Sequence, residues 1–389
     1  MERDVFVLSA VRTPIGKYGG GLEPVPPCDL AASVTKEAVR RAGAEPRDVG
    51  HVVFGNVLHT ETRDMYLSRV ACVNAGLPVE TPALTVNRLC GSGLQAVVSA
   101  AQAIMLGDCS VAVAGGAESM SRVPYWLPGM RWGQRMNDGV AVDAMVGALT
   151  DPFGQCHMGV TAENVAAEFG VSREDADALA AESHRRAAAA IEAGRFAEQI
   201  LPVEIPGRKG TTTVSADEHV RPGVSVEDLA RLRPAFQPGG TVTAGNASGI
   251  NDAAAAVVLA SSASGGAALG RLVAYSHAGV EPRIMGMGPV PAVRAVLDRA
   301  GLKTDEIDVF EVNEAFAAQA LAVTRALDLP PEKVNPNGSG VSLGHPIGAT
   351  GAILVVKALY ELRRVGGRYA LVTMCIGGGQ GIAAIFERA

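Results

Sequence analysis

The chain has 389 residues, a formal net charge of -6, 46 glycines and only 4% aromatic residues. This length exceeds that of a usual single domain, and the many small residues favour a layered α/β architecture over an aromatic-rich sandwich or barrel. The negative charge, together with the lack of a basic run or a recognition-helix signature, argues against a general nucleic-acid binder.

The first residues, MERDVFVLSAVRTPIG, carry charges at positions 2, 3 and 4 before one short apolar strand, which fits neither a signal peptide nor a membrane anchor. No uncharged stretch approaches the roughly 20 residues that span a bilayer, so we expect a cytoplasmic protein without membrane contact. The cysteines form no CxxC pair, which predicts free thiols and no metal site. They stand at Cys28, Cys72, Cys90, Cys109, Cys156 and Cys375.

A helix-turn-strand pattern occurs twice along the chain. In the first copy, a helix-like segment ends at Gly43, and the strand HVVFGN follows an acidic turn and closes on Asn56. In the second copy, a helix-like segment ends at Gly301, and the strand VFEVN closes on Asn313. The two segments therefore indicate one structural unit that is used twice.

The units that follow also correspond. The segment PALTVNRLCGSG leads into a buried helix expected over 94–106 and then the strand SVAVAGGAESM. The segment VNPNGSGVSLGHPIGATG leads into another helix and then the strand YALVTMCIGGG. Counted from Gly107 and Gly366, which follow the two helices, Gly116 and Cys375 fall at matching positions.

Cys90 and His345 both stand before the starts of these two equivalent helices. A lone cysteine is often a small core residue, and a lone histidine is often structural. If the halves pack as a pseudo-dimer, however, the two helix starts approach each other, and a cysteine with a histidine makes a nucleophile and its base. We expect the helix N-terminus to lower the pKa of the Cys90 thiol.

A segment of different character separates the halves and is interpreted as an inserted loop or lid domain. It contains the helical run 172–193, which begins with a Ser-x-x-Asp capping box. The sequence SGINDAAAAVVLAS then resumes the first half and is expected to form a helix and a strand, and SSASGGAALG is a hinge. The predicted boundaries are 1–120 and 249–269 for the first half, 121–248 for the insert and 270–389 for the second half.

Two further positions suggest catalytic chemistry. Cys375 ends a strand and precedes a glycine run whose free amides could stabilise an oxyanion while the thiol exchanges a proton. A glycine run serves tight turns equally well. Asn313, in VNEAF, could hold a water or a carbonyl oxygen with its amide, and its alternative role is a helix N-cap.

The motifs NRLCGSG, NEAF, GHPIGATG and CIGGGQG together resemble the thiolase family. The segments VRTPIGKYGG, HMGVTAEN, GTVTAGNASG and MGMGP also resemble family segments, in the expected order. The resemblance implies an α/β thiolase fold, in which two repeated βαβαβαββ halves pack as a five-layered αβαβα pseudo-dimer with an inserted loop domain. It also implies a homo-oligomer, usually a tetramer in bacterial short-chain members.

The resemblance also assigns roles to residues of this chain. Cys90 would accept the acyl group, and His345 would activate it. Cys375 would exchange the α-proton of the acetyl unit, and Asn313 would hold a water that forms an oxyanion hole with His345. The backbone amides of Cys90 and Gly377 would form a second oxyanion hole, in a ping-pong reaction.

Coenzyme A is expected to bind along the inserted segment. The residues that match the pantetheine path, the nucleotide path and the acyl pocket are His157, Met158, Arg221, Phe236, Ser248, Met285 and Phe316. A local positive charge for the anionic ligand is expected from Arg208, Lys209, Arg221, Arg231 and Arg233. Any one of these arginines could equally be a solvated surface charge.

The function implied is reversible condensation of acetyl-CoA with acetyl-CoA or a short acyl-CoA to give a 3-ketoacyl-CoA and CoA. No cofactor is required, since CoA thioesters are the substrates. The segment GSGVSLG, where many biosynthetic members carry Gly-Gly-Ala, looks most like broad-specificity β-ketothiolases of polyester-storing bacteria. The alternatives are a degradative 3-ketoacyl-CoA thiolase of fatty-acid β-oxidation and a non-catalytic acyl-CoA or lipid carrier. A decarboxylating synthase would carry a second histidine, or an asparagine, in place of the second cysteine, and a dinucleotide-binding oxidoreductase would carry GxGxxG.

Overall fold

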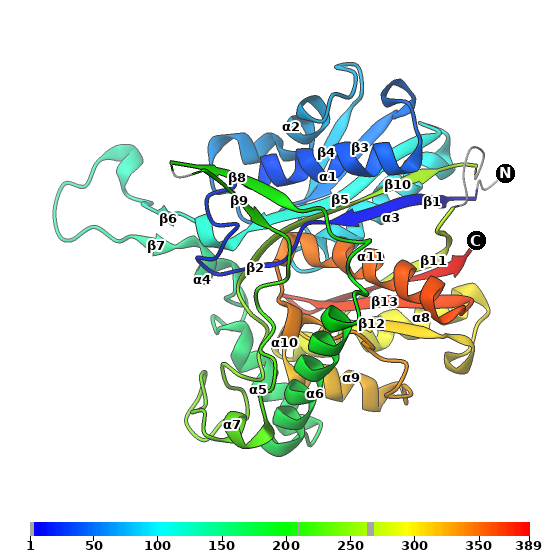
Figure 1. Ribbon diagram of the computed structural model, residues 1–389. Helices are drawn as coiled ribbons and strands as arrows, with labels where there is room; N and C mark the ends of the chain where they lie inside the picture. Colours follow the sequence, from blue (N-terminus) through cyan, green and yellow to red (C-terminus); the bar gives the residue numbers. More distant parts are fainter. Residues whose placement is uncertain (1–3, 209, 263–267) are drawn as a thin grey trace.

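The computed structural model describes residues 4–208, 210–262 and 268–389 (Figure 1). Its main sheet has the strand order β12-β13-β14-β11-β1-β10-β5-β3-β4. The strands of the first half are β1 (Phe6–Arg12), the short β2 (Gly16–Lys17), β3 (His51–Gly55), β4 (Ala83–Val86), β5 (Val111–Ser119) and β10 (Asn251–Ala260). Those of the second half are β11 (Gly270–Gly279), β12 (Val309–Val312), β13 (Tyr369–Ile376) and β14 (Gln380–Arg388). The halves join where β1 pairs with β11.

Helices alternate with these strands in both halves. They are α1 (Pro27–Ala42), α2 (Leu67–Asn74), α3 (Ser92–Leu106), α8 (Pro289–Ala300), α9 (Ala317–Ala326), α10 (Gly340–Leu343) and α11 (Ile347–Val365). The order β1-α1-β3-α2-β4-α3-β5-β10 is repeated as β11-α8-β12-α9-α11-β13-β14. In the second half an isolated parallel bridge between Phe310 and Val334 stands where the first half has β4. The predicted α/β fold of two βαβαβαββ halves is confirmed, with one strand reduced to that bridge.

The repeated helix-turn-strand unit has the same local geometry in both copies. α1 ends at Gly43 with φ 62°, and α8 ends at Gly301 with φ 66°. Glycine adopts this left-handed conformation without a Cβ clash, which is why it ends both helices. A 3₁₀ turn follows each glycine, at Pro46–Asp48 and at Thr304–Glu306, and leads into β3 or β12.

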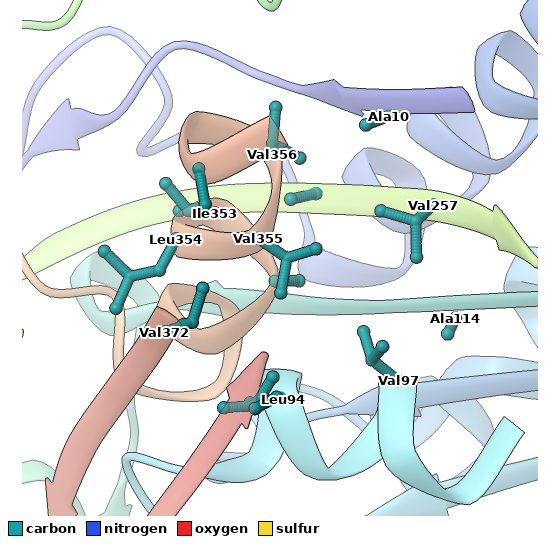
Figure 2. Close-up of a cluster of buried hydrophobic side chains, with 14 of the residues drawn as sticks. Ala10, Leu94, Val97, Ala114, Val257, Ile353, Leu354, Val355, Val356 and Val372 are labelled. Atoms are coloured by element: carbon teal, nitrogen blue, oxygen red, sulfur yellow. The ribbon is translucent and has the colours of Figure 1, made fainter. Parts of the chain in front are cut away.

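The elements form five layers. α1 and α2 cover the strands of the first half, α8 and α9 cover those of the second half, and α3 and α11 lie between the halves (Figure 1). Figure 2 shows part of this middle layer, where Val97 of α3 and Val355 of α11 pack with Val257 of β10, Ala114 of β5 and Val372 of β13. The helices that follow Cys90 and His345 therefore share one apolar core.

α3 and α11 approach each other through glycines near their N-terminal ends. A Cβ on Gly93 would lie 2.6 Å from the backbone nitrogen of Ala352, and a Cβ on Gly351 would overlap the backbone of Leu94. By length and composition the stretch Leu89–Leu106 could cross a membrane, but it forms α3, packed against α11 and β5. The close crossing brings the starts of the two helices together.

Between β5 and β10 the chain leaves the main sheet. This segment forms the hairpins β6 (Tyr125–Trp126) with β7 (Val142–Asp143) and β8 (Val203–Gly207) with β9 (Gly210–Val214). Its helices are α4 (Ala144–Ala148), α5 (Met158–Glu168), α6 (Arg173–Glu192) and α7 (Val226–Ala230). The β6-β7 hairpin extends away from the rest of the molecule (Figure 1).

Two local predictions for this region can be compared with the structure. The predicted helix 172–193 is confirmed as α6, and the Ser172 side chain caps it by accepting from the Asp175 amide. The Asp175 carboxylate also accepts a hydrogen bond from Arg325 (2.8 Å). The sequence SGINDAAAAVVLAS was predicted to begin with a helix, which is wrong, because β10 is extended from Asn251 and buried between β1 and β5. Part of the predicted hinge, 263–267, lies outside the described residues.

Candidate active site

A cavity of about 270 Å³ lies at the starts of α3 and α11. Cys90, His345 and Cys375 line it together, although they come from different elements. Its wall also contains the predicted residues His157, Met158, Phe236, Ser248, Met285 and Phe316. Nine of the predicted site residues therefore surround one space.

Cys90 stands on a tight turn between β4 and α3. The preceding residue, Leu89, has φ 45°, a left-handed conformation that is strained for a residue with a branched side chain. The Ser92 hydroxyl holds the turn by accepting from the Arg88 amide (2.8 Å) and donating to the Leu89 carbonyl (2.7 Å). The Asn87 side chain accepts from the Leu89 amide (2.9 Å). These contacts fix the backbone that presents the thiol.

The electrostatic environment of Cys90 differs from the one expected from the sequence. Burial raises the pKa of the Cys90 thiol to about 11, although hydrogen bonds from the backbone amides of Gly377 and Cys90 act in the opposite direction. The expected net lowering by the helix N-terminus is therefore wrong for the unliganded cavity, because removal from water outweighs it. The thiol is therefore neutral near pH 7 and would need a base to act as a nucleophile.

His345 is held in a defined orientation beside the cavity. Its backbone amide donates to Asn251 Oδ1 (3.0 Å), and its Nδ1 lies 2.7 Å from Thr350 Oγ1. The Thr350 hydroxyl donates to the Pro346 carbonyl (2.9 Å), so it accepts from Nδ1–H. Nε2 then carries the free lone pair, and it is buried without a hydrogen-bond partner among the described residues. Burial lowers the pKa of His345 to about 4, which keeps the ring neutral and able to accept a proton.

Cys375 is the penultimate residue of β13 and is completely buried. Burial raises the pKa of its thiol well above the usual range, and the neighbouring Cys90 adds to this effect. The glycine run that follows contains Gly378 (φ 80°) and Gly379 (φ 85°), which turn the chain into β14. This turn directs the Gly377 amide toward Cys90.

Asn313 lies just after β12, with a side chain that is completely buried. Neither Oδ1 nor Nδ2 has a hydrogen-bond partner among the residues described. The alternative prediction of an N-cap is wrong, because α9 begins at Ala317 and has Phe316 at its N-cap. A buried amide without a partner is costly, so this group is suited to a polar oxygen bound in the site. Asn313 and Gly377 do not themselves line the cavity.

Aromatic side chains form the outer wall of the cavity. The His157 ring stacks on Phe236 with centroids 4.7 Å apart, and Phe236 meets Phe316 edge to face at 6.1 Å. Gly159 allows this arrangement, because a Cβ there would overlap the Phe236 ring. Met158 and Met285 complete an apolar cluster that also contains Cys375. Flat rings and flexible thioethers suit a narrow slot for an extended, largely apolar chain.

The predicted basic patch is only partly assembled. Arg221 is exposed and does not line the cavity, and its backbone amide donates to His184 Nδ1 (3.1 Å). Arg231 and Arg233 follow α7 and are also exposed, whereas Arg208 follows β8, whose hairpin packs on the core of the first half. Lys209 lies outside the described residues. Arg208 is therefore separated from the others, because the hairpin and α7 lie at different ends of the insert (Figure 1).

Comparison with known proteins decides the family. The model of the thiolase N-terminal domain matches residues 5–263, and that of the thiolase C-terminal domain matches residues 266–388. The chain belongs to the thiolase family. Together the two matches span nearly the whole of this thiolase.

The relatives of this thiolase are similar along their full length. It is 64% identical to the β-ketothiolase BktB of Cupriavidus necator, with 100% of each chain covered. It is 44% identical to the human mitochondrial 3-ketoacyl-CoA thiolase, over 99% of this chain and 98% of the relative. The crystal structure of the Bacillus anthracis acetyl-CoA acetyltransferase superposes with a TM-score of 0.98 at 46% identity, covering 100% and 99% of the two chains.

Three residues of this thiolase support the site but were missed by sequence reasoning. Thr350 orients the His345 ring, Asn251 anchors the His345 backbone, and Glu118 binds the start of α11. Thr350 stands in the quoted GHPIGATG motif, five residues after the histidine, which was a usable signal. Asn251 and Glu118 come from distant strands, and their contacts depend on tertiary structure. Among the described residues, no group of three His, Cys, Asp or Glu side chains could hold a metal ion.

Proposed function

We propose that this thiolase reversibly condenses acetyl-CoA with acetyl-CoA or a short acyl-CoA, giving a 3-ketoacyl-CoA and free CoA. The observation that carries the proposal is the convergence of Cys90, His345 and Cys375 on one apolar cavity. The 64% identity to a β-ketothiolase supports the same activity. CoA thioesters are the substrates, and no metal or redox cofactor enters the proposed chemistry.

In the first half-reaction, the acyl group moves from CoA to the Cys90 sulfur. Nε2 of His345 accepts the thiol proton as the sulfur attacks the thioester carbonyl, because the thiol is neutral beforehand. The amides of Cys90 and Gly377 would stabilise the oxyanion that forms on the attacked carbonyl, and their hydrogen bonds to the Cys90 sulfur support this role. Collapse of the tetrahedral intermediate breaks the bond to the CoA sulfur, which takes the proton from His345, and leaves acyl-Cys90.

In the second half-reaction, acetyl-CoA is deprotonated at its α-carbon and attacks acyl-Cys90. Because burial keeps the Cys375 thiol protonated, Nε2 of His345 first takes its proton, and the resulting thiolate is the proposed base for the α-proton. In thiolysis the Cys375 thiol returns the proton to the leaving acetyl unit. The enolate oxygen is stabilised by His345 and by a water held on Asn313, whose amide has no hydrogen-bond partner in the described part of the chain. The acyl–sulfur bond to Cys90 then breaks as the carbon–carbon bond forms, and the Cys90 thiolate takes the proton from Nε2 of His345.

The shape and lining of the site favour short acyl groups. Its volume is about 270 Å³, and Leu149, Met158, Phe236, Met285 and Phe316 give it an apolar wall. His157, Ser248 and Arg221 would serve the pantetheine and nucleotide parts of CoA. Structures of related thiolases include a human mitochondrial 3-ketoacyl-CoA thiolase in complex with CoA. A broad-specificity biosynthetic role is favoured over a degradative one because the higher identity is to the β-ketothiolase.

We also infer a cytoplasmic homo-oligomer, with the tetramer as the expected form. Residues 121–248 are proposed as the inserted domain that contributes to assembly, between the first half (1–120, 249–269) and the second (270–389). The support is the projecting β6-β7 hairpin, which exposes Tyr125, Trp126, Leu127, Met130, Trp132, Met136 and Val140. So many exposed apolar side chains indicate a protein contact. Light scattering of the purified protein measures the number of subunits.

Thiolysis of acetoacetyl-CoA tests the proposed activity directly. Adding CoA to the enzyme and acetoacetyl-CoA should remove the absorbance of the magnesium enolate of the substrate. A protein that only carries acyl-CoA would leave this absorbance unchanged, and that result would refute the proposal. Repeating the assay with 3-ketovaleryl-CoA and longer substrates then defines the range of acyl chains.

The pH dependence of kcat/KM tests the role of His345. Burial lowers the pKa of His345 to about 4, so the ring stays neutral as the pH falls through the usual histidine range and becomes protonated only near the lowered value. We expect kcat/KM to show no acid limb from an ordinary histidine between about pH 5 and 8. Initial rates measured after a brief exposure to each pH provide the profile. An acid limb centred on the ordinary histidine pKa would contradict the assignment.

A further inference from the structure

Glu118 is a buried carboxylate that the proposed chemistry does not use. It lies near the end of β5, and its side chain is fully inaccessible to solvent. Oε1 accepts from Asn56 Nδ2 (3.1 Å) and from the Leu58 amide (3.1 Å). Oε2 accepts from the amides of Val57 (3.1 Å) and Gly348 (2.9 Å). Each carboxylate oxygen therefore receives two N–H groups, which is the arrangement expected for an acceptor without a proton of its own.

The bond to Gly348 connects this carboxylate to the catalytic base. Gly348 is the second residue of α11, and His345 immediately precedes the proline that caps this helix. The first amides of a helix have no partner within the helix, and the positive end of its dipole favours an anion there. A Cβ on Gly348 would lie 2.5 Å from Glu118 Oε2, so glycine is needed for the close approach.

The other bonds connect the carboxylate to the surroundings of the nucleophile. Val57 and Leu58, whose amides it accepts, belong to an apolar cluster that also contains Ile347 and Cys90. One carboxylate thus holds the start of α11 against the segment that packs beside the nucleophilic cysteine. Gly348 itself approaches β5 so closely that a Cβ on Gly116 would overlap its carbonyl group.

The repeat places Glu118 opposite a catalytic position in the other half. Gly116 corresponds to Cys375, so Glu118, two residues later in β5, corresponds to Gly377. In the second half this position presents an amide to the start of α3, where Cys90 lies. In the first half the same position presents a carboxylate to the start of α11. The two helix starts therefore face groups of opposite polarity.

We propose that Glu118 is a positioning residue, whose carboxylate fixes the start of α11 and thereby holds His345 in reach of the Cys90 thiol. This inference rests on the proposed acyl transfer through Cys90. Among the described residues Glu118 has no ion-pair partner, so its four N–H donors provide its stabilisation. A glutamine at this position would place its NH₂ group where one carboxylate oxygen now accepts two N–H groups. In either orientation of the amide, two of the four hydrogen bonds are therefore lost.

The charged surroundings define a second readout. The titratable groups around Cys90 are Glu118, His345, Cys375 and, across the same cavity, His157. Glu118 also feels the carboxylate of Asp64, and burial raises its pKa to about 8. That value is below the pKa of about 11 for Cys90, so Glu118 is ionised when the thiol titrates and opposes its ionisation. Loss of the charge should therefore shift ionisation of Cys90 to lower pH.

Two variants test separately the charge of the Glu118 side chain and its length. For Glu118→Gln, assayed above pH 8 where the wild-type carboxylate is ionised, we expect kcat to fall on the order of 10²-fold, because a small misplacement of a catalytic group has this effect. We expect KM for CoA to stay near the wild-type value, and the pH midpoint for alkylation of Cys90 by iodoacetamide to decrease. Glu118→Asp keeps the charge but is one methylene shorter, so it should lower kcat without a decrease in the alkylation midpoint.

Asp64→Asn is the matched control. Asp64 is also a fully buried carboxylate that accepts backbone amides, from Thr60 (2.6 Å) and Glu61 (3.1 Å), but its thiol neighbour is Cys28. We expect wild-type kcat and the wild-type alkylation midpoint for this variant. Wild-type kcat in both Glu118 variants would overturn the inference, whereas an inactive wild-type enzyme would refute the proposed function instead. If Glu118→Gln does not fold, Glu118→Asp alone tests the inference. A wild-type kcat in Glu118→Asp would then overturn the positioning role of Glu118.

Discussion

Replacing Cys90 with serine is expected to abolish thiolysis of acetoacetyl-CoA, with a loss in kcat on the order of 10⁴-fold or more. The serine hydroxyl is a weaker nucleophile with a higher pKa, and the buried site that already raises the pKa of the thiol to about 11 disfavours an alkoxide even more. The loss of enolate absorbance gives the rate, and intact-protein mass spectrometry shows whether an acyl adduct forms.

Cys109→Ser is the control for this change. Cys109 is also a free thiol, but it is buried, follows α3 at the end away from Cys90 and does not line the cavity. We expect this variant to retain wild-type turnover and to form the acyl adduct. Turnover in Cys90→Ser comparable with that of Cys109→Ser would exclude Cys90 as the nucleophile.

Cys375→Ala is expected to stop the reaction halfway. Acetyl transfer from acetyl-CoA to Cys90 needs His345 and the two amides but not the second thiol, so the variant should release one equivalent of CoA and retain an acetyl adduct. Condensation to acetoacetyl-CoA needs removal of an α-proton, and loss of such a base lowers a rate by about 10² to 10⁴-fold. Quenched-flow measurement of CoA release, followed by mass spectrometry, separates the two steps.

The matched variant here is His345→Ala, which should fail in both half-reactions. It removes the proposed base for the Cys90 thiol. In the wild type the His345 ring is neutral and able to accept a proton, because burial lowers its pKa to about 4. If Cys375→Ala condenses acetyl-CoA at the wild-type rate, or fails to accept the acetyl group, the separate roles of the two cysteines are wrong.

The internal repeat could be predicted from local sequence signals, and the five-layered fold was implied by the resemblance to the thiolase family. Gly43 and Gly301 end equivalent helices in the same left-handed conformation, and such helix ends can be recognised from single residues. The repeat then related Cys90 to His345, two residues that no short motif connects. The cavity brings them together as expected.

The remaining features depend on contacts that the sequence does not encode locally. The alanine run of β10 is extended because it pairs with strands on both sides, and this overrides the helical preference of alanine. The pKa of Cys90 is raised because the depth of burial, not the helix start, dominates. The role of Glu118 depends on hydrogen bonds to residues from both halves, so only the assembled structure reveals it.

The crossing of α3 and α11 has a mechanical consequence for catalysis. The contact points Gly93 and Gly351 lie within about two helical turns of Cys90 and His345, respectively, and they bring backbone against backbone. These contacts lie close to the N-terminal ends of both helices. A tilt of one helix about this contact therefore moves the far end of that helix much more than the end next to the cavity. A substitution in the distant core can therefore change the packing at the far ends of the helices well before it changes the separation of Cys90 and His345.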